Sequence, residues 1–138
     1  MIRGFGLALL VAVSIAGSPG DGSPSSQGTR LRDVMQEKLE HSQQILSAVV
    51  TSNWVNLERH SLELLRLTED PAWTAFKTPE YARYSGAFLQ AVEDLVEAAR
   101  RRDLETAPVA YVSLTMSCVQ CHRHVGRARL AGAEGRFQ

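Results

Sequence analysis

The chain has 138 residues, of which 44% are hydrophobic and 22% are charged. This composition is typical of a globular and not a disordered protein, and the length is that of one ordinary domain, which argues against a two-domain protein. The 15 basic residues are balanced by 15 acidic ones, which argues against a nucleic-acid-binding protein. No apolar run reaches the roughly 18 residues that a membrane span needs, so we expect no span in the mature form.

The first residues predict a removable export signal over 1–16. Arg3 gives a short charged start, an apolar stretch follows over residues 5–15, and small residues precede a cleavage site near Ala16. The alternative is an uncleaved anchor. Segment 17–28 is almost wholly Gly, Ser, Pro, Asp and Gln, which predicts a disordered leader. The mature protein is therefore expected in the periplasm or otherwise exported.

Four segments then carry apolar residues at steps of three and four, the spacing of amphipathic helices. They cover residues 29–52, 53–70, 78–102 and 103–126. No run of alternating β-branched residues predicts a strand. Because the connections near residues 52 and 102 are short, sequential helices are expected to be antiparallel neighbours. The sequence predicts an all-α, antiparallel up-down four-helix bundle over residues 29–130, followed by a flexible tail over 131–138.

Local signals mark the helix starts and the expected core. Thr29, Asn53 and Thr78 are suitable N-caps, and Pro79 follows Thr78 at a first helical position, where its missing N–H costs nothing. The longer link after the second helix contains Trp73 and Phe76, which we expect to fold back as a lid on one end of the core. The stripes expected to face the core are Leu31, Val34, Met35, Leu39, Ile45, Leu46 and Val49; Trp54, Leu57, Ser61, Leu64 and Leu65; Tyr81, Tyr84, Phe88, Val92, Leu95 and Ala99; and Tyr111, Leu114, Thr115, Cys118, His122 and Val125.

The feature that carries chemistry is a C-x-x-C-H sequence in the fourth segment. Cys118, Cys121 and His122 form this motif, and it uses both cysteines of the chain. It is the attachment signature of c-type haem. Residues three and four apart share a helix face, so one turn can supply two thiols for the haem vinyl groups and an imidazole for the iron. The sequence predicts one covalent haem c.

Three other uses of the cysteines compete with haem attachment. A dithiol redox site normally opens a helix after a strand, and no strand is predicted before Cys118. A structural disulfide between Cys118 and Cys121 would close only one turn and contribute little. A zinc site would need His122 and His124 as its remaining ligands, and these lie too close together to complete a four-ligand shell comfortably.

With these residues the sequence resembles the class II c-type cytochromes, the cytochrome c-prime type and its methionine-ligated low-spin relatives. The resemblance covers roughly residues 30 to 129, with Cys118, Cys121 and His122 matching the haem motif in the last helix. It implies an exported four-helix bundle with a distal residue on the first helix, where Met35 lies. The family usually has an aromatic and a basic residue shortly after the histidine, where this chain has Val125 and Gly126.

Met35 is the best candidate for the second axial ligand of the iron, because a thioether is a good soft partner for haem iron. Simple core packing of Met35 is the alternative. His41 and His60 are rival ligands, but each is expected to be solvated or hydrogen-bonded instead. Met116 precedes His122 on the same helix and cannot reach the opposite haem face.

The expected function is a monohaem c-type cytochrome that transfers electrons outside the cytoplasm. The alternatives are a five-coordinate haem protein that binds NO or CO, a haem peroxidase, and the electron-donating subunit of a larger oxidoreductase. No distal acid–base pair is recognisable, so we do not expect an enzyme. The expected partners are redox proteins, with a homodimer through helix faces left open and no nucleic acid. A basic C-terminal patch, formed by Arg123, Arg127, Arg129 and Arg136, could compensate haem propionates or steer an acidic partner, or be a solvated tail.

Overall fold

The computed structural model describes residues 24–74 and 76–134, and the regular structure in these ranges is entirely helical. The elements are α1 (Pro24–Val50), α2 (Trp54–Leu67), the short 3₁₀ helix η1 (Pro71–Thr74), α3 (Pro79–Arg101) and α4 (Thr106–Glu134). The prediction of an all-α protein with four helices is confirmed for these residues. The predicted export signal, most of the leader and the last four residues lie outside the described residues.

Side-chain caps define three of the helix starts. The Asn53 side chain accepts the backbone N–H of Asn56 over 3.1 Å, and the Thr78 hydroxyl accepts that of Tyr81 over 3.1 Å. Both residues were predicted as caps, and both satisfy amides that have no partner within their own helix. Asp103, which the sequence analysis did not assign as a cap, accepts the N–H of Thr106 over 2.9 Å at the start of α4.

The outer ends of α1 and α4 differ from the prediction. α1 begins at Pro24, so the last residues of the expected leader are helical and Thr29 is not a cap. Proline fits a first helical turn because its N–H would lack a partner there anyway. α4 continues through Gly126 to Glu134 instead of ending at Gly126. A glycine inside a helix costs only about 1 kcal/mol, so it weakens a helix without ending it.

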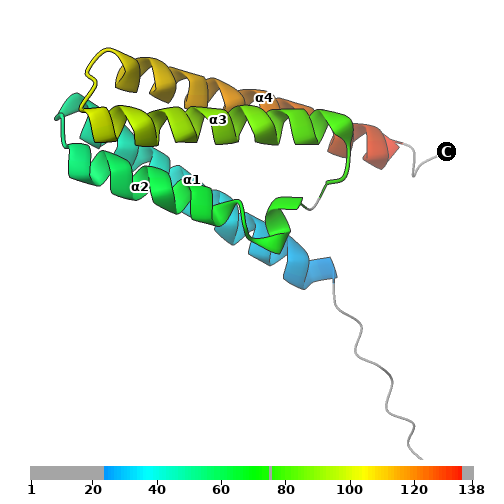
Figure 1. The fold of residues 1–138 in the computed structure, drawn as a ribbon. Coiled ribbons are helices and arrows are strands. Elements are labelled where there is room, and N and C mark those ends of the chain that lie inside the picture. The colour runs from blue at the N-terminus through cyan, green and yellow to red at the C-terminus, as the bar shows by residue number, and fades with distance from the viewer. Residues whose placement is uncertain (1–23, 75, 135–138) are drawn as a thin grey trace, which may run out of the picture.

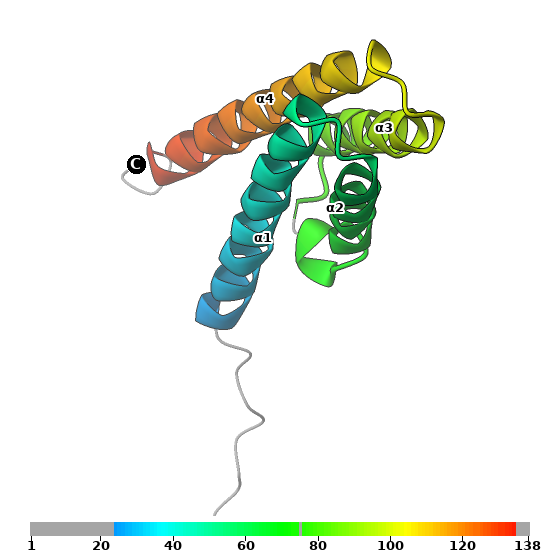
Figure 2. The same ribbon diagram turned by 90° about the vertical axis from the view of Figure 1, so that its left-hand side faces the viewer.

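Helices adjacent in the sequence pack side by side: α1 on α2, α2 on α3 and α3 on α4. The α1–α2 and α3–α4 connections lie at one end of the molecule (Figure 1). α1 and α4 contact each other only weakly, and they spread apart toward the other end in both views (Figures 1 and 2). The half of the molecule at this spread end holds the candidate site described below.

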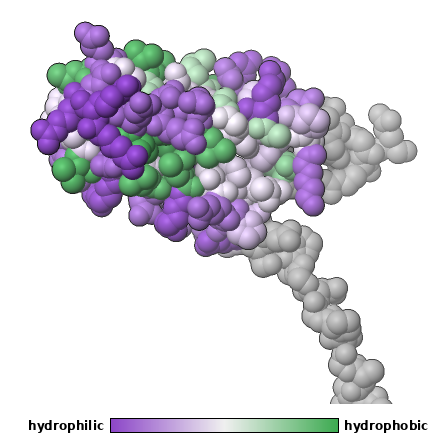
Figure 3. All heavy atoms as spheres, in the orientation of Figure 1, coloured by the Kyte–Doolittle hydropathy of each residue, from purple (hydrophilic) through white to green (hydrophobic). Residues whose placement is uncertain are grey.

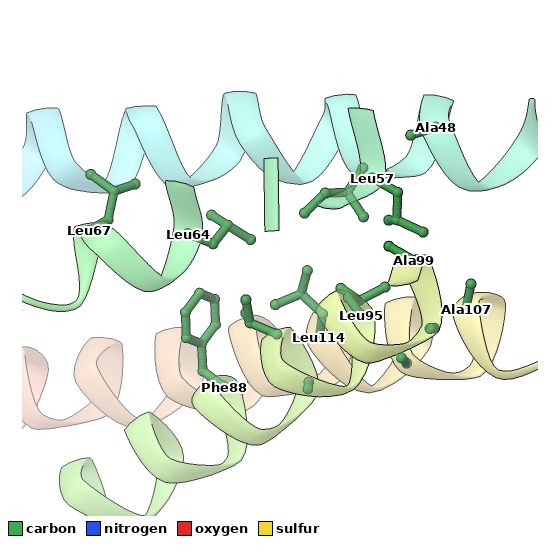
Figure 4. Close-up of a cluster of buried hydrophobic side chains, with 14 of the residues drawn as sticks. Ala48, Leu57, Leu64, Leu67, Phe88, Leu95, Ala99, Ala107 and Leu114 are labelled. Carbon is green, nitrogen blue, oxygen red and sulfur yellow. The ribbon is translucent and has the colours of Figure 1, made fainter. Parts of the chain in front are cut away.

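The core lies where the helices converge. Leu57 and Leu64 of α2 point toward Phe88 and Leu95 of α3, and Leu114 of α4 joins them (Figure 4). These five side chains are buried, and the sequence stripes predicted all of them. Burial of such side chains contributes roughly 1.5–3 kcal/mol each relative to exposure.

Two predicted core residues of α1 are not in the core. Leu39 and Leu46 are exposed, while Ala48 is buried against α2 instead. α1 packs mainly on one neighbour, α2, so only a narrow stripe of its surface is covered. The apolar stripe predicted for α1 is therefore wider than the part of the helix surface that α2 covers.

The face of the molecule drawn in Figure 3 carries mostly polar side chains, with apolar patches between them. Within the part of the chain that the structure describes, no helix is long and apolar enough to span a membrane.

Candidate functional site

A cavity of about 660 Å³ lies at the spread end, a size within the roughly 300–1,000 Å³ typical of small-molecule and cofactor sites. α1, η1, α3 and α4 all contribute to its walls. The lining residues are Gly28, Thr29, Leu31, Arg32, Met35, Lys38, Trp73, Phe76, Tyr81, Tyr84, Ser85, Phe88, Ser117, Cys118, Cys121, His122, Val125 and Gly126.

All three chemistry-bearing residues of the C-x-x-C-H motif line this cavity from α4. Cys118 and Cys121 are half-buried, whereas His122 is exposed at the residue level. One helical turn brings the three side chains to the same wall, since positions three and four apart lie on one helix face. Both cysteines are free thiols in the structure.

Met35 lines the same cavity from α1. It is half-buried and also packs against the edge of the hydrophobic core. The structure thus brings together the four residues that the sequence singled out for haem binding, Cys118, Cys121, His122 and Met35. Met116 is exposed and does not line the cavity.

The two rival histidine ligands lie elsewhere and bind each other. His41 of α1 and His60 of α2 have their Nδ1 atoms 2.9 Å apart, and neither lines the cavity. The Arg59 guanidinium donates to Nε2 of His60 over 3.0 Å. Because a guanidinium can only donate, His60 must carry its proton on Nδ1 and donate it to His41. Burial, the positive charge of Arg59 and the neighbouring His41 lower the pKa of His60.

Aromatic side chains form much of the cavity wall. Trp73 of η1 is buried, with its ring centroid 5.1 Å from that of Phe88. Phe76 lies in the link before α3, with its centroid 5.4 Å from that of Tyr81, whose hydroxyl donates to the Trp73 carbonyl. Trp73 and Phe76 therefore fold back onto this end of the core, as predicted from the sequence.

Lys38 is a cavity residue that the sequence analysis missed. Its Nζ lies 3.9 Å from the ring centroids of both Trp73 and Phe88, in the geometry of a cation–π contact. Burial lowers the pKa of Lys38 to about 8, while the thiols of Cys118 and Cys121 act in the opposite direction. The available signal was its spacing, because Lys38 follows Met35 by three residues and so shares its helix face.

The cavity is electrostatically biased toward anions. Arg32 and Lys38 are among its lining residues, which include no aspartate or glutamate within the described part of the chain. The predicted basic patch lies elsewhere: Arg123 and Arg127 are exposed and do not line the cavity. Arg129 and Arg136 fall where side chains are not described. An anionic, largely apolar ligand therefore suits the cavity better than a cation.

The surroundings of the two cysteines affect the thiols and argue against a zinc site. Burial raises the pKa of Cys121, and Cys118 adds to this effect while Lys38 opposes it. Among the described residues, no group of three or more His, Cys, Asp and Glu side chains is arranged to hold a metal ion by itself, which disfavours a zinc site. His124 instead contacts Tyr84, with ring centroids 5.4 Å apart.

The residues present fit a covalently held haem. Two thiols, an imidazole and a thioether line a cavity with aromatic walls and two cations, and no described residue lining it is acidic. These are the groups that thioether attachment, axial ligation and the two carboxylates of a haem require. Comparison of the chain with protein-family models, with curated proteins and with solved structures found no match.

Proposed function

We propose that this protein is an exported monohaem c-type cytochrome that transfers electrons. The observation that carries the proposal is the meeting of Cys118, Cys121 and His122 with Met35 at one cavity, from α4 and from α1. The resemblance to class II c-type cytochromes supports the same function. We further infer an antiparallel up-down four-helix bundle, which the short connections between α1 and α2 and between α3 and α4 support.

The chain would hold the haem through α4. Cys118 and Cys121 would hold it through thioethers: each S–H would add across a vinyl C=C, with sulfur on one carbon and the proton on the other, and no oxidant would be required. The His122 imidazole lies one residue after Cys121, on the same cavity wall, and would serve as the proximal ligand. When bound, haem supplies a one-electron couple at its iron.

The surrounding side chains would tune that couple. Trp73, Phe88 and Tyr81 are buried and exclude water from one side of the cavity, which is a determinant of redox potential. The cations Arg32 and Lys38 would balance the charge of the haem carboxylates. The exposed edge of His122 would leave α4 as the route by which electrons reach a partner protein.

Met35 decides between an electron carrier and a gas-binding protein. A methionine thioether as sixth ligand raises the potential and leaves no free position, which suits electron transfer. If Met35 only packs against the core, the distal position is open to NO or CO. Met35 lines the same cavity as the C-x-x-C-H motif but from a different helix, α1, and this favours ligation, so we propose the carrier.

An optical spectrum of the reduced protein, with and without CO, tests this assignment. We expect a low-spin spectrum that CO changes slowly or not at all, and a sulfur-to-iron charge-transfer band in the oxidised protein. Met35→Ala should remove that band and allow rapid CO binding. Met116→Ala is the matched control, because Met116 lies outside the cavity and its loss should change neither property.

Rapid CO binding by the unaltered protein would reject the carrier in favour of the gas-binding alternative. If Met35→Ala remains low-spin and refractory to CO, another side chain is the ligand. Lys38 is then the next candidate, since it lines the cavity and the two rival histidines do not. The double variant Met35→Ala, Lys38→Gln would identify it by a change to high spin.

A further inference from the structure

α4 carries a second apolar stripe, whose four side chains are all exposed. Val109, Val112, Met116 and Val119 are between 46% and 66% exposed. Apolar side chains reach the surface along the edge of the molecule formed by α4 (Figure 3). The steps between them are three, four and three residues, which is the spacing of a coiled-coil seam.

This stripe faces away from both the core and the cavity. The core side of α4 is formed by buried residues at the same spacing, Ala107, Ala110, Leu114 and Ser117. At about 100° per residue, positions 109 and 112 lie roughly 200° around the helix from 107 and 110. Contact at the outer stripe would therefore leave the cavity and the C-x-x-C-H motif accessible.

One charged residue continues the stripe at each end, and these two residues carry opposite charges. Glu105 lies four residues before Val109, and Arg123 lies four residues after Val119. Glu105 belongs to the first turn of the helix, which Asp103 caps. The Asp103 side chain accepts the N–H of Glu105, and the Asp103 backbone carbonyl accepts the N–H of Ala107. Both side chains are exposed, and neither forms an ion pair with another described residue.

We propose that α4 pairs with α4 of a second copy of this chain in an antiparallel, twofold-symmetric dimer. With the axis level with residue 114, Val109 meets Val119 of the second copy and Val112 meets its Met116. In the same register, Glu105 of each copy meets Arg123 of the other. One symmetric arrangement thus covers all four apolar side chains and forms two ion pairs, as a self-complementary interface requires.

The dimer should be reversible. A seam of four apolar side chains per copy is smaller than the interfaces of permanent dimers, which bury more than about 2,000 Å². We therefore expect a dissociation constant on the order of micromolar and rapid exchange. The proposal does not depend on haem, because the stripe and its charged ends lie outside the cavity lining.

Sedimentation velocity of the mature protein over a range of concentrations tests this interface. The unaltered protein should change from monomer to dimer as the concentration rises. Val112→Glu places two carboxylates near the centre of the seam and should leave a monomer. Val55→Glu is the matched control, because Val55 is a 76% exposed valine of α2 and its change should have no effect. Circular dichroism would verify that each variant keeps its helix content.

Charge exchange tests the register. Glu105→Arg or Arg123→Glu alone would set like charges opposite each other twice per dimer and should weaken association at least about tenfold. The double variant Glu105→Arg, Arg123→Glu restores the pairs with reversed sign, so its dissociation constant should return to within a few-fold of the original. Glu93→Arg, an exposed charge of α3, is the control.

Three results would overturn the proposal. The first is a monomer at every concentration, and the second is a dimer that Val112→Glu leaves intact. The third is a monomer that binds phosphatidylcholine vesicles through the same valines, which would assign the stripe to a lipid surface. Dimerisation without covalent haem would reject the proposed cytochrome function while leaving this interface standing.

Discussion

Lys38 offers a quantitative test of the cavity in the haem-free chain. Its ammonium group is largely buried between Trp73 and Phe88, and burial lowers its pKa from 10.5 to about 8. Because this folded-state pKa lies below the unfolded one, the protonated amine destabilises the fold. The penalty is fully present below pH 8 and is lost as the pH rises from about 8 to 10.5.

The size of the effect follows from the pKa difference. Each pKa unit is worth about 1.4 kcal/mol, so the penalty at pH 7 is about 3 kcal/mol. The two cation–π contacts offset about 0.5–2 kcal/mol of it. Lys38→Met keeps an unbranched side chain, one heavy atom shorter, and removes the charge. We expect this variant to be about 1–3 kcal/mol more stable than the unaltered chain at pH 7.

Urea unfolding of the chain expressed from residue 17, without the export segment and under reducing conditions, measures the free energy of unfolding of both chains. Repeating it over a range of pH gives the pH dependence of their difference. The advantage of Lys38→Met should be largest at pH 6–7 and should shrink as the pH approaches 10.5. Arg32→Met provides the control, because Arg32 lines the same cavity but is exposed. An advantage that does not vary with pH, or a variant less stable than the unaltered chain at pH 7, would refute the reasoning.

Three further variants test the fold through equilibrium unfolding. Leu64→Ala removes a fully buried side chain and should lower the free energy of unfolding by about 2–5 kcal/mol; a loss below 1 kcal/mol would contradict the core assignment. Thr78→Ala removes the cap of α3 and should cost about 1 kcal/mol, whereas no loss would mean that the cap contributes nothing. His60 has a lowered pKa, so stability should fall as the pH drops below about 6.5 and the unfolded chain takes up the proton. His60→Gln should reduce this dependence between pH 7 and 5, and an unchanged dependence would assign it to other groups.

The sequence predicted those parts of the fold that depend on local signals. Asn53 and Thr78 act as caps because a short polar side chain beside the first turn is sufficient for capping, whatever the rest of the fold. The grouping of Cys118, Cys121 and His122 on one wall also follows from helix geometry alone. Trp73 and Phe76 were placed correctly because two large aromatic rings in a link after a helix have few places to be buried.

What depends on contacts between helices could not be read from spacing. Leu39 lies on a correct helical stripe but is exposed, because α1 packs against a narrow strip of its neighbour. Lys38 was missed because its enclosure depends on rings from η1 and α3, which are distant in the sequence. The His41–His60 pair likewise needs α1 and α2 side by side.

The most direct test of the central claim is the mass of the exported protein after denaturation and solvent extraction of free haem. We expect the mass of the polypeptide plus one haem, with haem absorbance retained on the unfolded chain. The double variant Cys118→Ser, Cys121→Ser should lose both, and His122→Ala should keep the covalent haem but lose its proximal ligand. A polypeptide of unmodified mass with no retained haem absorbance would contradict the assignment of this protein as a c-type cytochrome.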